Sequence, residues 1–329
     1  MNQYRQTKRF CTSMVLLALC FRLTLEGVPQ LLFSRLFQPG PSPFPIYLET
    51  GRNVRFSSSS PVFVDHVRES PAPVLKPEIP VFSRADAATL ELTDTCGLKP
   101  DLEALLEQPL SWDLTGQDPT VLILHTHTTE SYAKAGESYE ETAAYRTLDE
   151  DYNMLSMGAL LARELENRGI SVIQDRSIHD YPSYNGSYSH ARASVKKYLE
   201  QYPSIRLILD LHRDASGTAG KQMRTETTVQ GRPSAQLMLV VGTDASSLRH
   251  EHWQENLSLA LKLHLQLQRS NPGIVRPLNL RAQRFNQDLL PGMLLVEVGA
   301  AGNTHAEAEA TIWMLAEAIE SLSRGTDIS

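Results

Sequence analysis

The 329-residue sequence has only three cysteines, Cys11, Cys20 and Cys96, and all of them precede the regular pattern of strands and helices that begins near residue 120. This scarcity excludes a disulfide framework. It also excludes a cysteine nucleophile as the basis of the chemistry, because no cysteine lies in the patterned region. A metal ion bound there would depend on His, Asp and Glu side chains.

The sequence also lacks the features of proteins that bind nucleic acids or nucleotides. Its formal net charge is −7, and residues 1–37 hold five Lys or Arg residues against one acid, so the remainder carries a formal charge of about −11. Such an acidic surface is unsuited to the phosphates of a nucleic acid. No glycine-rich phosphate loop follows any expected strand, which argues against a bound nucleotide.

The amino terminus lacks an uninterrupted apolar run long enough to span a bilayer. Three basic residues precede the apolar residues 10–21, and Arg22 then interrupts the run. A spanning helix usually needs about 20 apolar residues, so the run must continue past Arg22 to reach that length. No small-residue cleavage site follows it. The pattern favours an uncleaved membrane anchor in residues 1–37 over a secretory signal or a buried amphipathic helix.

The next segment, residues 38–85, is expected to be a linker. Nine of the 19 prolines lie in residues 39–80, and no sustained hydrophobic period is visible there. Proline-rich spacers are extended and semi-rigid. The linker would therefore hold the expected catalytic domain, residues 86–329, away from a membrane.

From residue 120 onward, short apolar runs alternate with amphipathic helical patterns. This alternation predicts an α/β fold, specifically a three-layer α/β/α sandwich with a mixed, mostly parallel sheet covered by helices on both faces. The expected strands are 120–125, 170–174, 205–212, 224–229, 236–242 and 294–298. The expected helices are 102–106, 150–168, 189–202, 250–270 and 305–323.

His127, His212 and Glu297 lie at the carboxyl ends of three of these apolar runs. Open α/β sheets place ligands at the carboxyl ends of their strands, so the three segments could converge. Hydrolytic zinc is commonly held by two imidazoles and one carboxylate, with a fourth position open for water. His127, Glu130 and His212 offer that ligand set. Glu297 is then the expected general base.

Each of these residues also has a structural interpretation. His212 is followed by Arg213 and Asp214, which together could form a salt-bridged turn, and Glu297 could cap the helix that follows it. His125 is expected to be a buried hydrogen-bonding residue rather than a ligand. Spacing alone leaves these alternatives open.

Several ordered motifs follow one another in this region. They read HTHTTESY at 125–132, HDYPSYNGSY at 179–188, DLHRDA at 210–215, NQDL at 286–289 and EVG at 297–299. With this set, the whole segment 121–304 resembles the stage II sporulation protein P family, the membrane-anchored cell-wall hydrolases of endospore-forming bacteria. The ordered set is far more specific than any one motif.

The resemblance implies an amidase-like or zinc-carboxypeptidase-like fold and the activity of a zinc-dependent N-acetylmuramoyl-L-alanine amidase. Such an enzyme cuts peptidoglycan between N-acetylmuramic acid and the first L-alanine of the stem peptide, and the family is also credited with cleaving peptide cross-links. The implied partners are stage II sporulation proteins D and M, which act with it on the septal wall during engulfment. The expected anchor would place the catalytic domain outside the cytoplasm, at the cell membrane.

The resemblance also implies roles for single residues. His127 and His212 match the two metal histidines, and Glu297 matches the catalytic carboxylate. The third zinc ligand is expected to be Glu130. The alternatives are Asp149 and Glu141, because related amidases take a carboxylate just before their first helix.

Substrate-binding roles are expected for four further residues. Arg146 and Arg213 suit the carboxylates of a stem peptide or a developing oxyanion, because a planar guanidinium binds such groups in a fork. Asn286 and Gln287 suit the amides of a sugar or peptide, although a structural turn explains them almost as well.

Two other functions compete with the amidase. One is an inactive peptidoglycan-binding scaffold that recruits another hydrolase, although a scaffold has no need of a general base at a strand end. The other is a zinc carboxypeptidase, which would release free carboxyl-terminal products.

Overall fold

The structure is a computed structural model that describes residues 80–134, 136, 145–215, 217–218 and 221–325. The expected anchor and nearly all of the expected linker therefore lie outside the described residues. Within the described residues, no helix combines the length and the apolar character needed to cross a bilayer. Phe82 is buried in the core, so the folded part begins before the expected boundary at residue 86.

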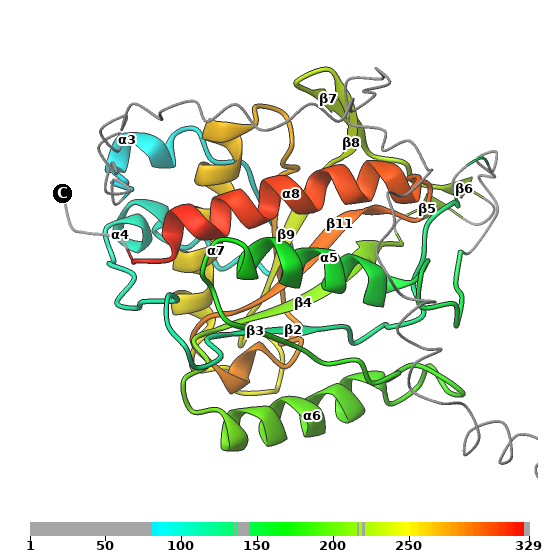
Figure 1. The fold of residues 1–329 in the computed structure, drawn as a ribbon. Coiled ribbons are helices and arrows are strands. Elements are labelled where there is room, and N and C mark those ends of the chain that lie inside the picture. The colour runs from blue at the N-terminus through cyan, green and yellow to red at the C-terminus, as the bar shows by residue number, and fades with distance from the viewer. Residues whose placement is uncertain (1–79, 135, 137–144, 216, 219–220, 326–329) are drawn as a thin grey trace, which may run out of the picture. The chain divides into compact units, whose positions relative to one another are not determined.

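A seven-stranded sheet forms the centre of the fold, with the strand order β1-β10-β9-β11-β4-β2-β3 (Figure 1). Its strands are β1 (Leu92–Asp94), β2 (Val121–Leu124), β3 (Val172–Gln174), β4 (Leu207–Asp214), β9 (Leu237–Gly242), β10 (Leu278–Arg281) and β11 (Met293–Ala300). Neighbouring strands run parallel, except for the antiparallel pair β9 and β11. The predicted mixed, mostly parallel sheet is confirmed.

Two small hairpins lie outside this sheet. One pairs β5 (Gly217–Thr218) with β6 (Lys221–Gln222), and the other pairs β7 (Glu226–Val229) with β8 (Arg232–Ala235). The expected strand 224–229 thus belongs to a hairpin, because its partner β8 follows after a two-residue turn.

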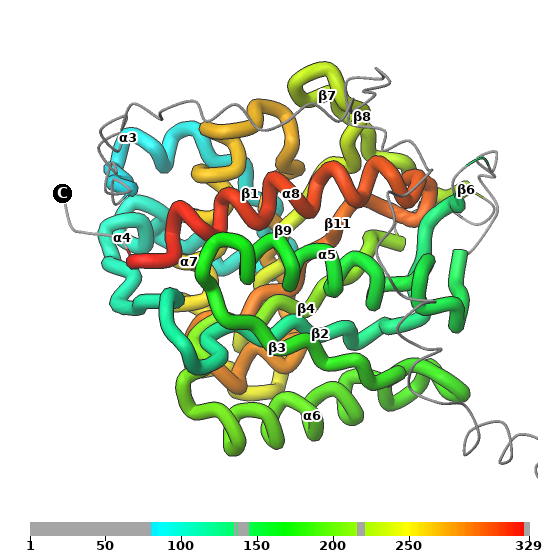
Figure 2. The backbone as a smooth tube through the Cα atoms, viewed as in Figure 1, coloured from blue at the N-terminus to red at the C-terminus, as the bar shows by residue number. Residues whose placement is uncertain are grey.

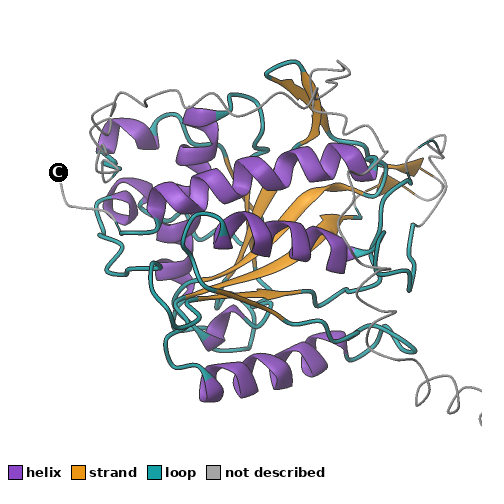
Figure 3. Cartoon of the chain, viewed as in Figure 1, coloured by secondary structure: helices purple, strands orange, loops and turns teal. Residues whose placement is uncertain are grey.

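Helices cover both faces of the sheet (Figures 1 and 3). One face carries α5 (Met154–Glu166), α7 (Trp253–Ser270) and α8 (His305–Leu322), and the opposite face carries α6 (Ser187–Gln201). Short helical segments complete the fold: α3 (Arg84–Ala87), α4 (Leu102–Leu106) and the 3-10 turn η1 (Gln287–Leu289). The expected helices are all present, with ends shifted by a few residues.

The two faces of the sheet bury different amounts of apolar surface. On the face of α5, α7 and α8, alternate strand residues such as Leu209, Leu211 and Val296 belong to the large core. On the face of α6, a smaller cluster includes Ile208 and Val195. Because side chains alternate along a strand, Asp210 and His212 point to the same face as Ile208. The smaller core therefore leaves this face room for polar residues near the carboxyl ends of β4 and β11.

Some sequence-based boundaries were wrong. β4 continues to Asp214 and β11 to Ala300, so His212 and Glu297 lie within strands rather than at their last positions. The short strands β1 and β10 were not expected from the sequence. Cys96, which precedes the regular pattern expected from residue 120 onward, lies just after β1 in contact with the hydroxyl of Thr243.

Helix α7 contains a buried cation. The Nζ atom of Lys262 donates to the carbonyl oxygen of Leu105 at 3.0 Å and to Oγ of Ser258 at 2.8 Å. The Lys262 side chain is almost wholly inaccessible to solvent, and this burial lowers the pKa of Lys262 to about 8. A buried ammonium without a carboxylate partner destabilises the fold wherever it stays charged.

We expect Lys262→Met to raise the unfolding free energy at pH 7 by up to about 3 kcal/mol, as a pKa depressed from 10.5 to about 8 implies. Below pH 8 the lysine is charged in both states, so the full penalty is present. Between pH 8 and 10.5 the folded state loses its proton first, and the stability of the wild type therefore rises with pH. Denaturant unfolding at pH 7 and pH 10 measures this, with exposed Lys197→Met as the control. The account is contradicted if Lys262→Met is no more stable than the wild type at pH 7, or if its gain in unfolding free energy is as large at pH 10 as at pH 7.

Candidate active site

The structure brings His127, His212 and Glu297 together on the α6 face of the sheet. His212 and Glu297 are direct register partners on the parallel strands β4 and β11, so their side chains project from the same face. Figure 2 shows these two segments side by side although they are distant in the chain. His127 follows β2, and its ring centroid lies 5.2 Å from that of His212, with the rings nearly perpendicular.

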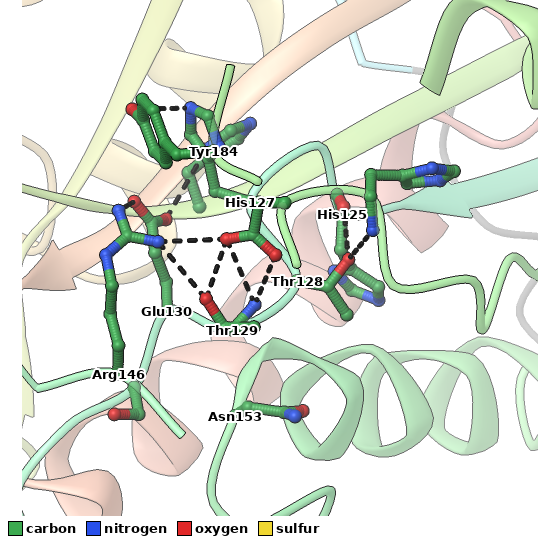
Figure 4. A network of polar contacts seen from close by, with 12 residues as sticks. His125, His127, Thr128, Thr129, Glu130, Arg146, Asn153 and Tyr184 are labelled. Atoms are coloured by element: carbon green, nitrogen blue, oxygen red, sulfur yellow. Dashed lines mark hydrogen bonds and ion pairs between the residues drawn. The ribbon is translucent and has the colours of Figure 1, made fainter. Parts of the chain in front are cut away.

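The turn that carries His127 is fastened to the strand beside it. The backbone N–H and the hydroxyl of Thr126 both donate to the buried carboxylate of Asp210, at 2.8 and 2.6 Å. The backbone N–H and the hydroxyl of Thr129 donate in the same way to Asp180, at 3.1 and 2.7 Å (Figure 4). His127 therefore lies in a turn that two carboxylates hold on either side.

His125 has the structural role expected for it. Its ring is fully buried, and its Nε2 atom lies 3.0 Å from Nε2 of Gln174. Helix α5 approaches this ring closely, because a Cβ atom placed at Gly158 would lie 2.4 Å from Nε2 of His125. Glycine at position 158 thus allows α5 to pack against the end of β2.

Glu130 is buried and surrounded by cationic groups. Its carboxylate accepts from Nη2 of Arg146 at 3.3 Å, from the backbone N–H of Arg213 at 3.2 Å and from Nη1 of Arg213 at 3.4 Å. Burial alone would raise the pKa of Glu130, but the charges of Arg213 and His212 outweigh it and lower that pKa to about 2. Glu130 is therefore ionised at any physiological pH.

His212 lies between two carboxylates. Its Nδ1 atom is 3.5 Å from Oε2 of Glu130, and its Nε2 atom is 3.0 Å from Oδ1 of Asp210, an ionic contact that lacks hydrogen-bond angles. Burial would lower the pKa of His212, but Asp210 and Glu130 raise it well above its usual range. These carboxylates favour positive charge at this point of the site.

His127 has the opposite electrostatic character. Burial, with a smaller contribution from the nearby His212, lowers the pKa of His127 to about 4. Its Nε2 atom forms a 3.0 Å hydrogen bond with the Tyr184 hydroxyl, while its Nδ1 atom is buried with no hydrogen-bond partner in the described part of the chain. A neutral imidazole keeps a lone pair, which a metal ligand requires.

Glu297 is a partly buried residue whose carboxyl group lies beside these rings. Burial, reinforced by Glu130 and Asp214 and opposed by His212, raises the pKa of Glu297 to about 8. Its Oε2 atom has no hydrogen-bond partner among the described residues. A carboxyl group with a pKa close to neutral pH is suited to both accepting and donating a proton.

Two structural alternatives for these residues are wrong. Residues 207–214 all belong to β4, so His212, Arg213 and Asp214 do not form a turn. The cap of α8 is Thr304, whose hydroxyl accepts from the backbone N–H of Glu307 in a capping box. Glu297 therefore does not cap that helix.

The donor types fit a divalent cation, although the ligand set is incomplete as placed. Within the described residues, no group of three or more His, Cys, Asp or Glu side chains is arranged as a metal site. The Glu130 carboxylate, the expected third ligand, accepts from Arg146 and Arg213. The Nδ1 atom of His127 is buried and has no hydrogen-bond partner among the described residues, and such an atom calls for a partner. Of the alternatives for the third ligand, Asp149 is half exposed and lies 3.6 Å from Lys134, and Glu141 lies outside the described residues.

The four predicted substrate-binding residues differ in accessibility. Arg213 is buried and bound to Glu130 and to the carbonyl oxygen of Tyr145. Gln287 is also buried; it accepts from the backbone N–H of Gly242 and donates to the carbonyl oxygen of Val240, which favours its structural alternative. Arg146, by contrast, has a side chain that is 33% exposed and lines a pocket of about 540 Å³. Asn286 is itself buried, although it lines a second pocket, of about 410 Å³.

Two tyrosines cover His127, and residue spacing predicts no role for either. The Tyr184 ring stacks on the His127 ring with centroids 4.5 Å apart, and the Tyr188 ring meets it edge-on at 5.6 Å. Tyr184 is about half exposed, so it forms the outer wall of the site (Figure 4). Both belong to the motif at 179–188, which is the only sequence signal that pointed to them.

The comparisons with known proteins define the class. A family model described as stage II sporulation protein P matches residues 71–320. The chain belongs to the stage II sporulation protein P family. Over 208 residues it is 28% identical to stage II sporulation protein P of Bacillus subtilis strain 168; the match covers 59% of this chain and 49% of that protein, about half of its length.

Two solved structures show a weaker similarity. One is N-acetylmuramoyl-L-alanine amidase from Clostridium difficile 630, with a TM-score of 0.35, 15% identity, and coverage of 62% of this chain and 94% of that chain. The other is the CwlD amidase from Clostridioides difficile in complex with the GerS lipoprotein, with a TM-score of 0.33, 15% identity, and coverage of 61% and 94%. Scores this low have no weight in the functional argument.

We expect Asp180→Asn to lower the unfolding free energy by about 1–3 kcal/mol, because it removes a buried, charged acceptor from Thr129 and Arg146. Chemical denaturation measures the change. The control is Asp118→Asn at an exposed position. Equal effects of the two substitutions would show that Asp180 does not hold the turn.

Proposed function

We propose that this chain is a zinc-dependent peptidoglycan hydrolase, an N-acetylmuramoyl-L-alanine amidase that acts on the septal wall during sporulation. The observation that carries the proposal is the convergence of His127, His212 and Glu297 on one face of the sheet. Membership of the stage II sporulation protein P family supports it. A glutamate with a raised pKa beside two imidazoles has a clear purpose in hydrolysis and little purpose in passive binding.

In this proposal His127 and His212 supply nitrogen ligands to zinc, and Glu130 supplies the carboxylate. Bound zinc would polarise the scissile carbonyl and acidify a water molecule. Asp210 contacts one ring nitrogen of His212, and Glu130 lies near the other. The contact of Asp210 with His212 resembles the arrangement in which a carboxylate outside the ligand set orients a metal-binding histidine. The two carboxylates that now favour a proton on His212 would equally favour a metal cation there.

Glu297 is the proposed general base. Its pKa of about 8 means that it can take a proton from water and return it to the leaving amine within the neutral pH range. Arg213 and Arg146 have a positioning role, because both hold Glu130. The sequence-based assignment of Arg213 to substrate carboxylates is therefore not part of the proposal.

The proposed setting follows the family. The scissile bond joins N-acetylmuramic acid to the L-alanine of the stem peptide, and peptide cross-links are a proposed second substrate. Stage II sporulation proteins D and M are the proposed partners. The proposed location is the cell membrane, with residues 1–37 as a single anchor and the catalytic domain outside the cytoplasm.

We expect the purified protein to contain about one zinc per chain and to release stem peptides from peptidoglycan. His127→Ala and His212→Ala should lose both properties. Glu297→Gln should keep the zinc, because Glu297 is not a ligand, yet lose about 10²–10⁴-fold in cleavage rate. Metal analysis and mass spectrometry of digested muropeptides measure these outcomes.

His252→Ala is the matched control, because this residue precedes α7 and lies outside the site. Zinc-free protein that still cuts peptidoglycan contradicts the proposal. Binding without cleavage, unchanged by Glu297→Gln, identifies a scaffold. Free carboxyl-terminal amino acids, in place of muramic acid with an exposed lactyl group, identify a carboxypeptidase.

A further inference from the structure

A pocket of about 410 Å³ lies where the first turns of α6 meet the loops that follow β9 and β10. Its walls include Tyr188 and Arg192 from α6, Leu248 from the loop after β9, and Arg284, Phe285 and Asn286 from the loop after β10. It is separate from the pocket that Arg146 and Tyr184 line. The proposed function does not use this pocket.

Aromatic rings connect this pocket to the proposed catalytic residues. Tyr188 contacts the His127 ring edge-on at 5.6 Å, and its other ring contact is Phe285, at 5.9 Å between centroids. Phe285 packs on the cluster that contains Met238, and Met238 is the antiparallel register partner of Glu297. A ligand in the pocket would therefore contact a ring, Tyr188, that itself contacts His127.

The pocket carries an excess of positive charge. Arg192 forms a forked ion pair with Asp288 at 2.8 and 2.7 Å, and Arg284 shares the same carboxylate at 3.3 Å. Two guanidinium groups thus share one carboxylate, and none of the lining residues is an Asp or Glu. Each arginine side chain is about one-quarter exposed, at 25% and 26%. The imbalance suits a ligand with one carboxylate.

The other pocket lacks this imbalance. Arg146 is its cation, and Asp180 and Glu130 already hold that guanidinium at 2.9 and 3.3 Å. Arg213 is buried and engaged with Glu130. The two arginines expected to bind stem-peptide carboxylates are therefore neutralised within the fold, whereas the pair at Asp288 is not.

The backbone of the pocket is also held in an unusual conformation. Phe285 and Asn286 are consecutive non-glycine residues with φ of +51° and +60°. The Asn286 side chain stabilises this turn by donating to the carbonyl oxygen of Tyr188 at 2.8 Å. Left-handed non-glycine residues are costly and gather at ligand-binding sites. In this protein the left-handed residues place the Phe285 ring against Tyr188, and they place Arg284 at the wall of the pocket.

We propose that this pocket binds the acidic stem peptide of the substrate, with a peptide carboxylate at Arg284 and Arg192 and apolar contacts at Phe285 and Leu248. The inference rests on the proposed function, because it assigns the peptide side of the same substrate. Arg284 and Arg192 are then specificity-determining residues.

The test uses a set of muramoyl peptides in which each free carboxylate is converted to a carboxamide in turn. Binding is measured by calorimetry on the Glu297→Gln protein, so that turnover does not interfere. We expect one amidation to weaken binding by about tenfold, the effect of one lost charge-assisted contact. Arg284→Gln should weaken binding of the acid by a similar factor and leave binding of that amide unchanged, so that the two changes are not additive.

Arg249→Gln is the matched control, since Arg249 lies on the same loop as Leu248 and is exposed. Arg284→Lys should retain part of the affinity for the acid. If no amidation weakens binding, or if Arg284→Gln weakens acid and amide alike, the subsite is overturned. Cleavage of these peptides by the wild type is measured in parallel. If the effects of Arg284→Gln and of amidation are not additive but the wild type cleaves none of the peptides, the hydrolase is refuted and the subsite stands. If the wild type cleaves the peptides but the two effects are additive, the subsite is refuted and the hydrolase stands.

Discussion

The buried carboxylate of Asp210 is the contact on which the site depends. It accepts two hydrogen bonds from Thr126 in the turn after β2, and it also lies 3.0 Å from the His212 ring on β4. One side chain thus fixes the position of both histidine segments. Without it, the turn that carries His127 would lose both of its hydrogen bonds to the side chain that also contacts the His212 ring. The β2–β4 ladder and the contacts of Arg213 with Glu130 would then be the remaining polar links between the two segments described here.

Charge is distributed unevenly around this contact. Asp210 and Glu130 raise the pKa of the His212 imidazole between them, and Arg213 and Arg146 in turn hold Glu130. The carboxylates favour a cation at His212, while burial lowers the pKa of His127 to about 4 and raises the pKa of Glu297 to about 8, where the carboxyl group exchanges a proton near neutral pH. Metal-assisted hydrolysis requires this division of roles, in which His127 and His212 favour a bound cation and Glu297 exchanges a proton.

Much of this could be predicted from sequence, for a physical reason. Long apolar runs such as 121–124 and 207–211 are buried on both faces, so the sheet and the convergence of their carboxyl ends were predictable. β1 and β10 were missed because three or four residues of mixed polarity give no periodic signal. The internal hydrogen bonds of Arg213 and Gln287 could not be predicted either. Only tertiary contacts decide whether a polar side chain points into the solvent or into the protein interior. The contacts of Tyr184 and Tyr188 with His127 depend on the tertiary fold in the same way.

The central claim is that His127 and His212 bind one divalent cation. X-ray absorption spectroscopy of the zinc-loaded protein tests it most directly. The account predicts two imidazole nitrogens at about 2.0–2.1 Å, and the loss of one of them in His212→Ala. A zinc environment without imidazole, or one that His212→Ala leaves unchanged, would contradict it.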